Sequence, residues 1–204
     1  MVIDMSRARL LWPSPRGWVV ILVAGLGAAG AVWAWRQYLQ TYHLATVRDG
    51  VLYRDGVRSL REFRTAVARV HPKTIVSLVD DTEITHEPFT DEMAFCRDHG
   101  IDVVRIPIQL GGWPLSEQLK QFLDLAADPQ RQPLLVHCAQ GVRRTGMMVA
   151  AYQESILGYS GDQARSAMLT FGHSQRTAGD VQRFIEFYDP ASRSLTRELE
   201  MSKE

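Results

Sequence analysis

The chain has 204 residues, of which 23 are basic and 23 acidic, so its formal net charge is zero. This length allows one domain or a small pair of domains, and the balanced charge offers no basic field that would attract a nucleic acid. Two cysteines, Cys96 and Cys138, are too few for a disulfide framework, and the six histidines show no zinc-type spacing. We therefore predict no nucleic-acid partner, no metal site and no organic cofactor.

The first predicted element is an apolar helix near the N-terminus. Residues 17–35, GWVVILVAGLGAAGAVWAW, carry no charge and lie between Arg16 and Arg36. As a helix this segment would span about 28 Å, close to the thickness of a bilayer hydrocarbon core. Tryptophans at both of its ends suit the membrane interfaces. These features predict a single-pass transmembrane anchor, and the alternatives are a cleaved signal peptide, suggested by GAAGA, and a buried core helix.

Strands and helices are then predicted to alternate along the chain. In chain order these elements are a short edge strand at 51–54, a helix at 59–70, a strand at 74–79, a helix at 87–100, a strand at 103–108, a helix from 116, a strand at 134–137, a helix from 145 ended by Gly158, and helices at 162–171 and 178–188. This alternation predicts an α/β sandwich with a mainly parallel central sheet flanked by helices, preceded by the one transmembrane helix. The predicted division of the chain is an N-terminal tail 1–16, the anchor 17–35, a linker 36–43, a catalytic domain 44–190 and a C-terminal tail 191–204, which we expect to be solvated from Arg193 onward.

The segment PLLVHCAQGVRRTGMMVA, residues 133–150, joins a predicted buried strand to a predicted helix. Its connecting loop directs backbone N–H groups and the positive end of the helix dipole to one place, which favours an anion. Cys138 stands in that field, which promotes the thiolate form, and Arg144 can grip two oxygens of a tetrahedral oxyanion. Gly141 allows the tight backbone path. The alternative for Cys138 is a buried cysteine with only a packing role.

The stretch HCAQGVRRTG resembles the His-Cys-x5-Arg-Thr-Gly phosphate-binding loop of the cysteine-dependent protein tyrosine and dual-specificity phosphatases. The surrounding residues 44–190 are similar, more loosely, to compact bacterial dual-specificity-like phosphatases. The resemblance implies that Cys138 attacks phosphorus, that Arg144 clamps the phosphate and that Thr145 aids turnover of the phosphocysteine. The residues implied to bind the substrate phosphate are Ala139, Gln140, Gly141, Val142, Arg143 and Arg144.

The chain departs from this family in the residue that protonates the leaving oxygen. Family members usually carry an aspartate before the helix predicted from 116, whereas this chain reads QLGGWPLSEQ there. Glu117 is the only acidic residue within 104–122. Glu117, Asp81 and Asp80 are therefore the candidates for the general acid, because loops at the carboxyl ends of parallel strands meet at one edge of the sheet. The alternative for each is a solvated surface carboxylate.

The favoured function is hydrolysis of a phosphomonoester on phosphotyrosine or mixed phosphoprotein substrates, through a phosphocysteine. A membrane-tethered phosphate-binding module without a proton donor is the alternative from another class. A phosphoinositide phosphatase is a further alternative, although lipid-directed relatives tend to carry lysines where Ala139 and Gln140 stand. A rhodanese-type sulfurtransferase is less favoured, because its loop is usually shorter.

The arginines around the apolar helix bear on the orientation of the anchor. Arg7, Arg9 and Arg16 precede the helix, while Arg36 and Arg48 follow it. Positive charges accumulate on the cytoplasmic side, so this small excess predicts a catalytic domain outside the cytoplasm. Oxidation of a reactive thiolate in such a compartment argues for the opposite orientation.

Overall fold

A computed structural model of the chain describes residues 14–39, 41–169 and 175–196. The chain separates into two units, residues 1–39 and residues 40–204, and each is described by itself. The first unit contains helix α1, Pro15–Leu39. Its segment Pro15–Arg36 is long and apolar enough to cross a membrane, and it is the one such helix among the described residues. This helix covers the predicted anchor 17–35.

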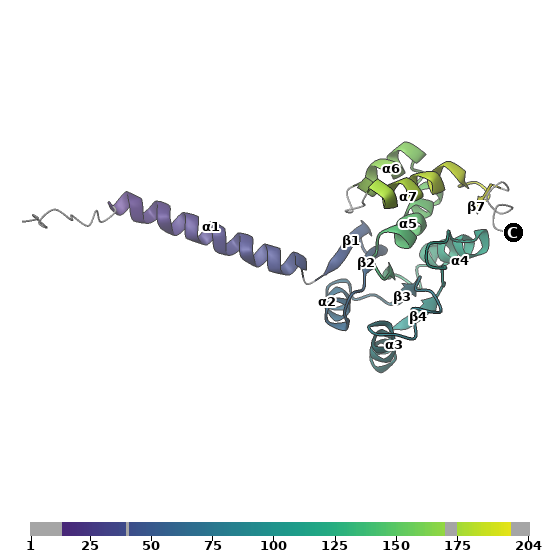
Figure 1. Cartoon of the computed structure of the whole chain (residues 1–204), viewed down its shortest axis with the longest axis horizontal. Helices are drawn as coiled ribbons and strands as arrows, with labels where there is room; N and C mark the ends of the chain where they lie inside the picture. Colours follow the sequence, from purple (N-terminus) through teal and green to yellow (C-terminus); the bar gives the residue numbers. More distant parts are fainter. Residues whose placement is uncertain (1–13, 40, 170–174, 197–204) are drawn as a thin grey trace, which may run out of the picture. The chain divides into compact units, whose positions relative to one another are not determined.

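The second unit is built around a five-stranded sheet with strand order β1-β2-β5-β3-β4 (Figure 1). The strands are β1 Tyr42–Arg48, β2 Leu52–Gly56, β3 Thr74–Ser77, β4 Asp102–Arg105 and β5 Leu134–Cys138. The pair β1–β2 is antiparallel, and the other neighbouring pairs are parallel. Because β5 lies in the middle of the sheet, all five of its residues are buried, which suits its apolar sequence LLVHC.

The prediction that strand 51–54 lies at the edge of the sheet is wrong. β1 forms the edge and pairs with β2, which therefore lies between β1 and β5. β1 begins at Tyr42, inside the segment 36–43 predicted as a linker. Its sequence YHLATVR shows no regular alternation of apolar and polar residues that would predict a strand. This agrees with the structure, in which most of its side chains are partly exposed and no face of the strand is fully buried.

Helices cover both faces of the sheet (Figure 1). They are α2 Leu60–Val70, α3 Phe89–Asp98, α4 Ser116–Ala127, α5 Arg143–Ser155, α6 Gly161–Leu169 and α7 Gln175–Phe187. Residues of α2 and α3 contribute to one hydrophobic cluster, and residues of α4, α5, α6 and α7 contribute to another. The sheet separates the two clusters, as expected for an α/β sandwich.

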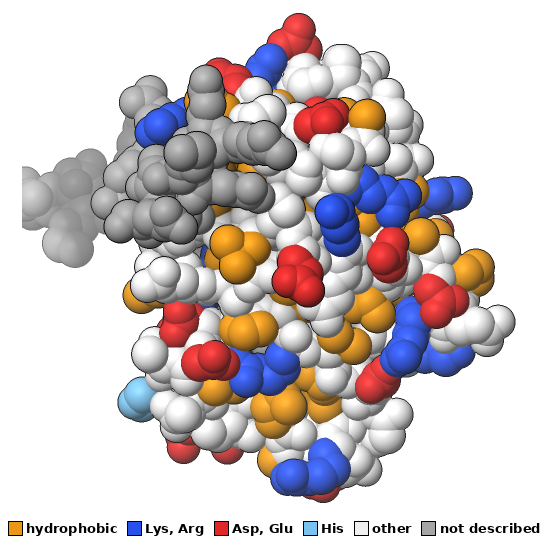
Figure 2. Space-filling model, turned by 90° about the vertical axis from the view of Figure 1, so that its right-hand side faces the viewer, with side chains coloured by type: hydrophobic (Ala, Val, Ile, Leu, Met, Phe, Trp, Pro, Cys, Tyr) orange, Lys and Arg blue, Asp and Glu red, His pale blue; other side chains and the backbone are white. Residues whose placement is uncertain are grey.

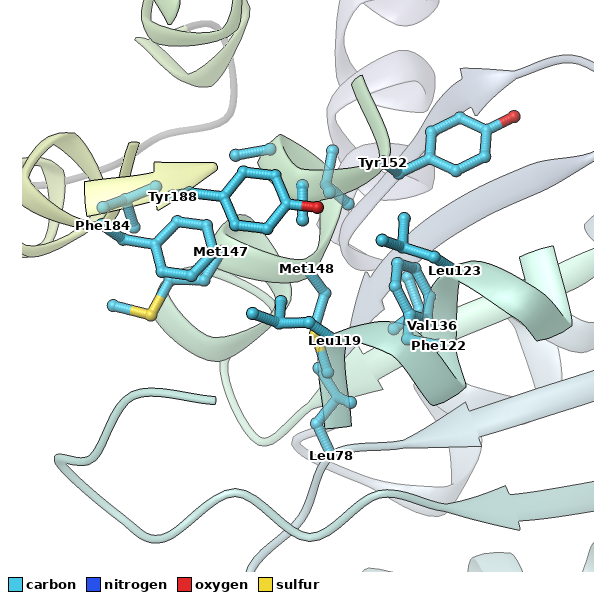
Figure 3. Close-up of a cluster of buried hydrophobic side chains, with 14 of the residues drawn as sticks. Leu78, Leu119, Phe122, Leu123, Val136, Met147, Met148, Tyr152, Phe184 and Tyr188 are labelled. Carbon is cyan, nitrogen blue, oxygen red and sulfur yellow. The ribbon is translucent and has the colours of Figure 1, made fainter. Parts of the chain in front are cut away.

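The larger core holds α5 against the sheet and against α4 and α7 (Figure 3). Its labelled side chains are Leu78, Leu119, Phe122, Leu123, Val136, Met147, Met148, Tyr152, Phe184 and Tyr188. A small hairpin of β6 Tyr188–Asp189 and β7 Ser194–Leu195 follows α7, and Leu195 is buried in the same core. The prediction of a solvated tail from Arg193 onward is wrong at Leu195, because this hairpin brings its side chain back to the core.

Charged side chains of both signs are interspersed on the face of the molecule drawn in Figure 2. The described part of the chain contains ion pairs at the surface, for example Arg58 with Glu62 and Arg193 with Asp124. On this face the described charges follow the balanced composition and do not gather into a patch of one sign.

Candidate active site

The phosphate loop, Cys138 to Arg144, connects the end of β5 to the start of α5. α5 begins at Arg143, two residues before the predicted start, so both arginines of the loop belong to its first turn. Gly141 has a φ of 66°, a conformation that L side chains rarely adopt, and a Cβ placed there would collide with the backbone of Asp55. From β2, the buried Arg54 donates a hydrogen bond to the carbonyl oxygen of Gly141. The neighbouring strand β2 thus stabilises the path of the loop.

The Cys138 thiol is buried and accepts two hydrogen bonds. The backbone N–H of Gly141 and the hydroxyl of Thr145 each donate to its sulfur at 3.2 Å. Burial alone would raise the pKa of Cys138, but the Arg144 guanidinium and these hydrogen bonds outweigh it, so the pKa lies below that of a free thiol. The site therefore favours the nucleophilic thiolate.

Arg144 is held by groups from two other segments of the chain, the loops that follow β3 and β4. Its Nη1 atom donates to the carbonyl oxygens of Leu78 and Ile108, which follow β3 and β4. The two terminal guanidinium nitrogens, Nη1 and Nη2, also donate to the Glu83 carboxylate, at 2.5 and 3.1 Å. These contacts orient the planar fork in the cavity beside Cys138. Glu83 was missed by the sequence analysis, although it follows Asp81 by two residues in a loop expected at this rim.

Arg143 connects the loop that contains Gly111 and Gly112 to helix α7. Its Nε atom lies 2.7 Å from the carboxylate of Asp180, and its two terminal nitrogens donate to the carbonyl oxygens of Gly111 and Gly112. Asp180 was not singled out from the sequence, because no local pattern indicates that α7 reaches the phosphate loop.

A cavity of about 500 Å³ opens above the cysteine. It is lined by Glu83, Leu110, Gly111, Cys138, Ala139, Gln140, Arg143, Arg144 and Asp180. Five of the predicted site residues are among them, whereas Gly141 and Val142 are buried in the loop and Thr145 is buried in the first turn of α5. Within the described ranges, no three His, Cys, Asp or Glu side chains are placed to hold a metal ion.

The predicted general acids lie elsewhere. Asp81 is exposed and pairs with Arg105 of β4 at 2.7 Å, which draws its side chain toward the edge of the sheet. Asp80 accepts hydrogen bonds from the amide and the hydroxyl of Thr82 and from the amide of Leu110. The two bonds from Thr82 contribute most to holding the pKa of Asp80 below its usual value. Glu117 is exposed in the first turn of α4. None of the three lines the cavity, whose carboxylates are Glu83 and Asp180.

The mainly parallel sheet with a cysteine and an arginine in a strand-to-helix phosphate loop defines a cysteine-phosphatase-type α/β domain. The chain belongs to the family described as DSP-PTPase phosphatase fused to NAD+ kinase, whose match covers residues 67–186, more than half of the chain. The matched residues include the whole phosphate loop.

Curated relatives agree with this assignment. The chain is 26% identical over 117 residues to the dual specificity protein phosphatase TpbA of Pseudomonas aeruginosa, covering 57% of this chain and 49% of that protein. It is 25% identical over 144 residues to the inositol diphosphatase SIW14 of Saccharomyces cerevisiae, covering 69% and 49%. A further match, to probable NAD kinase 2 of Oryza sativa, is 30% identical over 56 residues and covers 28% of this chain and 6% of that protein. The chain thus spans half or less of these relatives.

Solved structures share the fold. The core catalytic domain of SIW14 superposes with a TM-score of 0.60 at 24% identity, covering 73% of this chain and 87% of that one. TpbA in complex with pTyr superposes with a TM-score of 0.60 at 19% identity, covering 80% and 92%. The expected α/β cysteine-phosphatase fold is thereby confirmed.

Proposed function

We propose that this chain hydrolyses phosphomonoesters through a phosphocysteine on Cys138. The observation that carries the proposal is a buried sulfur with a lowered pKa in a cavity beside Arg144. The thiolate attacks phosphorus, the bond from phosphorus to the ester oxygen breaks, and that oxygen leaves with a proton. Water then attacks the phosphocysteine, the sulfur departs as thiolate, and the Thr145 hydroxyl at 3.2 Å donates a hydrogen bond to it.

We propose Asp180 as the acid that protonates the leaving oxygen. Glu83 and Asp180 are the carboxylates that line the cavity. Glu83 has both oxygens on Arg144, so proton donation from it would disrupt the phosphate clamp. Asp180 meets Arg143 through its Oδ2 atom and has a partly exposed side chain, so proton donation from it leaves the contacts between Arg144 and Glu83 intact. This assignment replaces Glu117 and Asp81, which lie outside the cavity.

The charge of the cavity supports a substrate with a single phosphate. Arg144 is paired with the Glu83 carboxylate, so with Asp180 protonated only Arg143 carries an unbalanced positive charge among these four side chains before a substrate binds. A highly phosphorylated inositol would bring many more negative charges than this site can balance. Leu110, which is 67% exposed at the rim, offers an apolar contact for an aromatic ring. Together with the relative solved in complex with pTyr, these features favour a phosphotyrosine side chain.

A substrate panel tests this proposal. We expect the full-length protein in detergent to release phosphate from a phosphotyrosine peptide at least about tenfold faster, in kcat/KM, than from a phosphoinositide or an inositol pyrophosphate. Faster release from the phosphoinositide would favour the lipid-directed alternative. Phosphate binding without release from any of the substrates would favour a phosphate-binding module.

We propose further that α1 anchors the protein in a membrane. Its segment Pro15–Arg36 carries charges only near its two ends, and the side chains described within it are almost all exposed. Large exposed apolar side chains such as Leu26 and Trp33 are stable next to lipid and unfavourable in water.

The anchor predicts the behaviour of the protein during fractionation. The full-length chain should stay with membranes after alkaline carbonate extraction, whereas a chain that begins at Gln37 should be recovered in the soluble fraction. A soluble product that begins after Ala31 would show that the helix is a cleaved signal peptide. Digestion of intact and opened cells with protease then reports the orientation, for which the flanking arginines favour a domain outside the cytoplasm.

A further inference from the structure

A histidine on the edge strand β1 contacts the backbone of the phosphate loop. The imidazole Nδ1 atom of His43 lies 2.9 Å from the carbonyl oxygen of Gln140, although the two residues are 97 positions apart in the chain. Because a carbonyl oxygen can only accept a hydrogen bond, Nδ1 carries the proton. His43 is not among the residues that line the cavity, and neither step of the proposed hydrolysis uses it.

The backbone of β1 is distorted where it carries this side chain. The register of β1 against β2 shifts between Tyr42 and Ala45, which places one extra residue on β1 in the manner of a β-bulge. His43 lies in this bulge with a φ of 64°, an uncommon conformation for residues other than glycine. Its ring stacks on that of Tyr42, with the ring centroids 3.9 Å apart. Backbone strain of this kind persists only where surrounding contacts maintain it, and it is frequent at functional sites.

The peptide group between Gln140 and Gly141 connects His43 to the reacting centre. Its carbonyl oxygen accepts the hydrogen bond from His43, and its N–H donates to the sulfur of Cys138 at 3.2 Å. The C=O and N–H of a planar trans peptide point in opposite directions, so a donor that fixes the carbonyl also fixes the N–H. Arg54 of β2 holds the carbonyl oxygen of the next peptide, that of Gly141. Donors from β1 and β2 thus hold two consecutive carbonyl groups of the phosphate loop.

The glycine at position 141 makes this peptide group easy to turn. Such a rotation changes ψ of Gln140 and φ of Gly141, which is 66° here, and glycine adopts both signs of φ. After the rotation the carbonyl oxygen would face the bound phosphate, and the negative ends of the two groups would repel each other. The absence of a side chain at Gly56 leaves space for the carbonyl in its present orientation, since a Cβ there would collide with it. A donor on this carbonyl therefore stabilises the orientation that offers an N–H to an anion.

We propose that His43 is a positioning residue for phosphate binding, whose hydrogen bond to Gln140 keeps the N–H of Gly141 directed at the bound anion. This role rests on the proposed phosphatase function and adds the edge strand β1 to the site. Without the donor, a fraction of the molecules would present the carbonyl oxygen to the phosphate, so the anion would bind less tightly. The loss of one hydrogen bond to an uncharged group corresponds to an affinity change of about two- to tenfold.

The substitution His43→Gly separates the donor from the backbone strain. It removes the imidazole and also relaxes the bulge, because glycine readily adopts a φ of 64°. The dissociation constant of inorganic phosphate, measured from the NMR signal of the Gly141 amide in the full-length protein in detergent, should rise by about two- to tenfold. A purely structural role of the bulge predicts no such rise. An unchanged dissociation constant would overturn the proposal.

Two further variants test whether the donor itself is responsible. Asparagine tolerates a positive φ and its side-chain amide can donate to a carbonyl, so His43→Asn should recover part of the lost affinity. His71, an exposed residue with a φ of 49° at the C-terminal end of α2, provides the matched control. His71→Gly should leave the affinity for phosphate unchanged. Equal losses in His43→Gly and His43→Asn, or an equal loss in His71→Gly, would contradict the role of the donor.

A measurement on the unsubstituted protein avoids any change in stability. The nitrogen chemical shifts of the His43 ring should show a protonated Nδ1, and a ring without a proton on Nδ1 would contradict the proposal. None of these measurements requires turnover. Failure of the unsubstituted protein to bind phosphate would argue against the proposed hydrolysis, whereas undiminished binding in His43→Gly would overturn only the positioning role.

Discussion

Cys138→Ser should reduce phosphate release by on the order of 10⁴-fold or more, while phosphate binding is retained. A serine hydroxyl does not ionise near neutral pH, so the nucleophile is lost. The other groups around the phosphate, the loop amides and the Arg144 guanidinium, stay in place. Release of p-nitrophenolate from its phosphate ester measures the first effect, and binding of a phosphopeptide by calorimetry measures the second.

The second cysteine provides the control for this prediction. Cys96 is completely buried in the core on the α2–α3 side of the sheet, and Cys96→Ser should leave the catalytic rate largely unchanged in folded protein. Orthovanadate, which resembles five-coordinate phosphorus, should compete with the substrate in the unsubstituted protein. Undiminished turnover in Cys138→Ser would rule out a phosphocysteine.

Asp180→Asn should lower the rate by about 10²–10⁴-fold for a substrate with a poor leaving group, such as phenyl phosphate. The loss should be far smaller for p-nitrophenyl phosphate, because a phenolate of low pKa can depart without a proton. The comparison of kcat for the two esters, in the variant and in the unsubstituted protein, measures this selectivity.

Glu83→Gln distinguishes proton donation from correct placement of the arginines. This variant loses the charge that pairs with Arg144, so both esters should be hydrolysed more slowly and by similar factors. A similar, unselective loss in Asp180→Asn would mean that Asp180 only positions Arg143. Selective loss in Glu117→Gln or Asp81→Asn instead would support the acids expected from the sequence.

Much of the fold could be predicted from the sequence, because buried strands and amphipathic helices leave clear patterns. The continuous apolar run before Cys138 predicts the central strand β5, and helix α2 is evident from the spacing of its apolar residues. The edge strand β1 escaped prediction, since its partly exposed side chains alternate poorly and its position depends on pairing with β2. The hairpin that buries Leu195 depends in the same way on contacts beyond the local sequence.

The sequence by itself determined the phosphate loop, because its cysteine, glycine and arginine lie within seven consecutive residues whose geometry follows from one strand end and one helix start. The tertiary structure decided which carboxylates meet that loop. Glu83 and Asp180 come from separate segments, and only the packing of the loop after β3 and of α7 around β5 brings them to the two arginines. The tertiary structure also decided that Asp81 stays outside the cavity, because its carboxylate pairs with Arg105 on the edge strand β4.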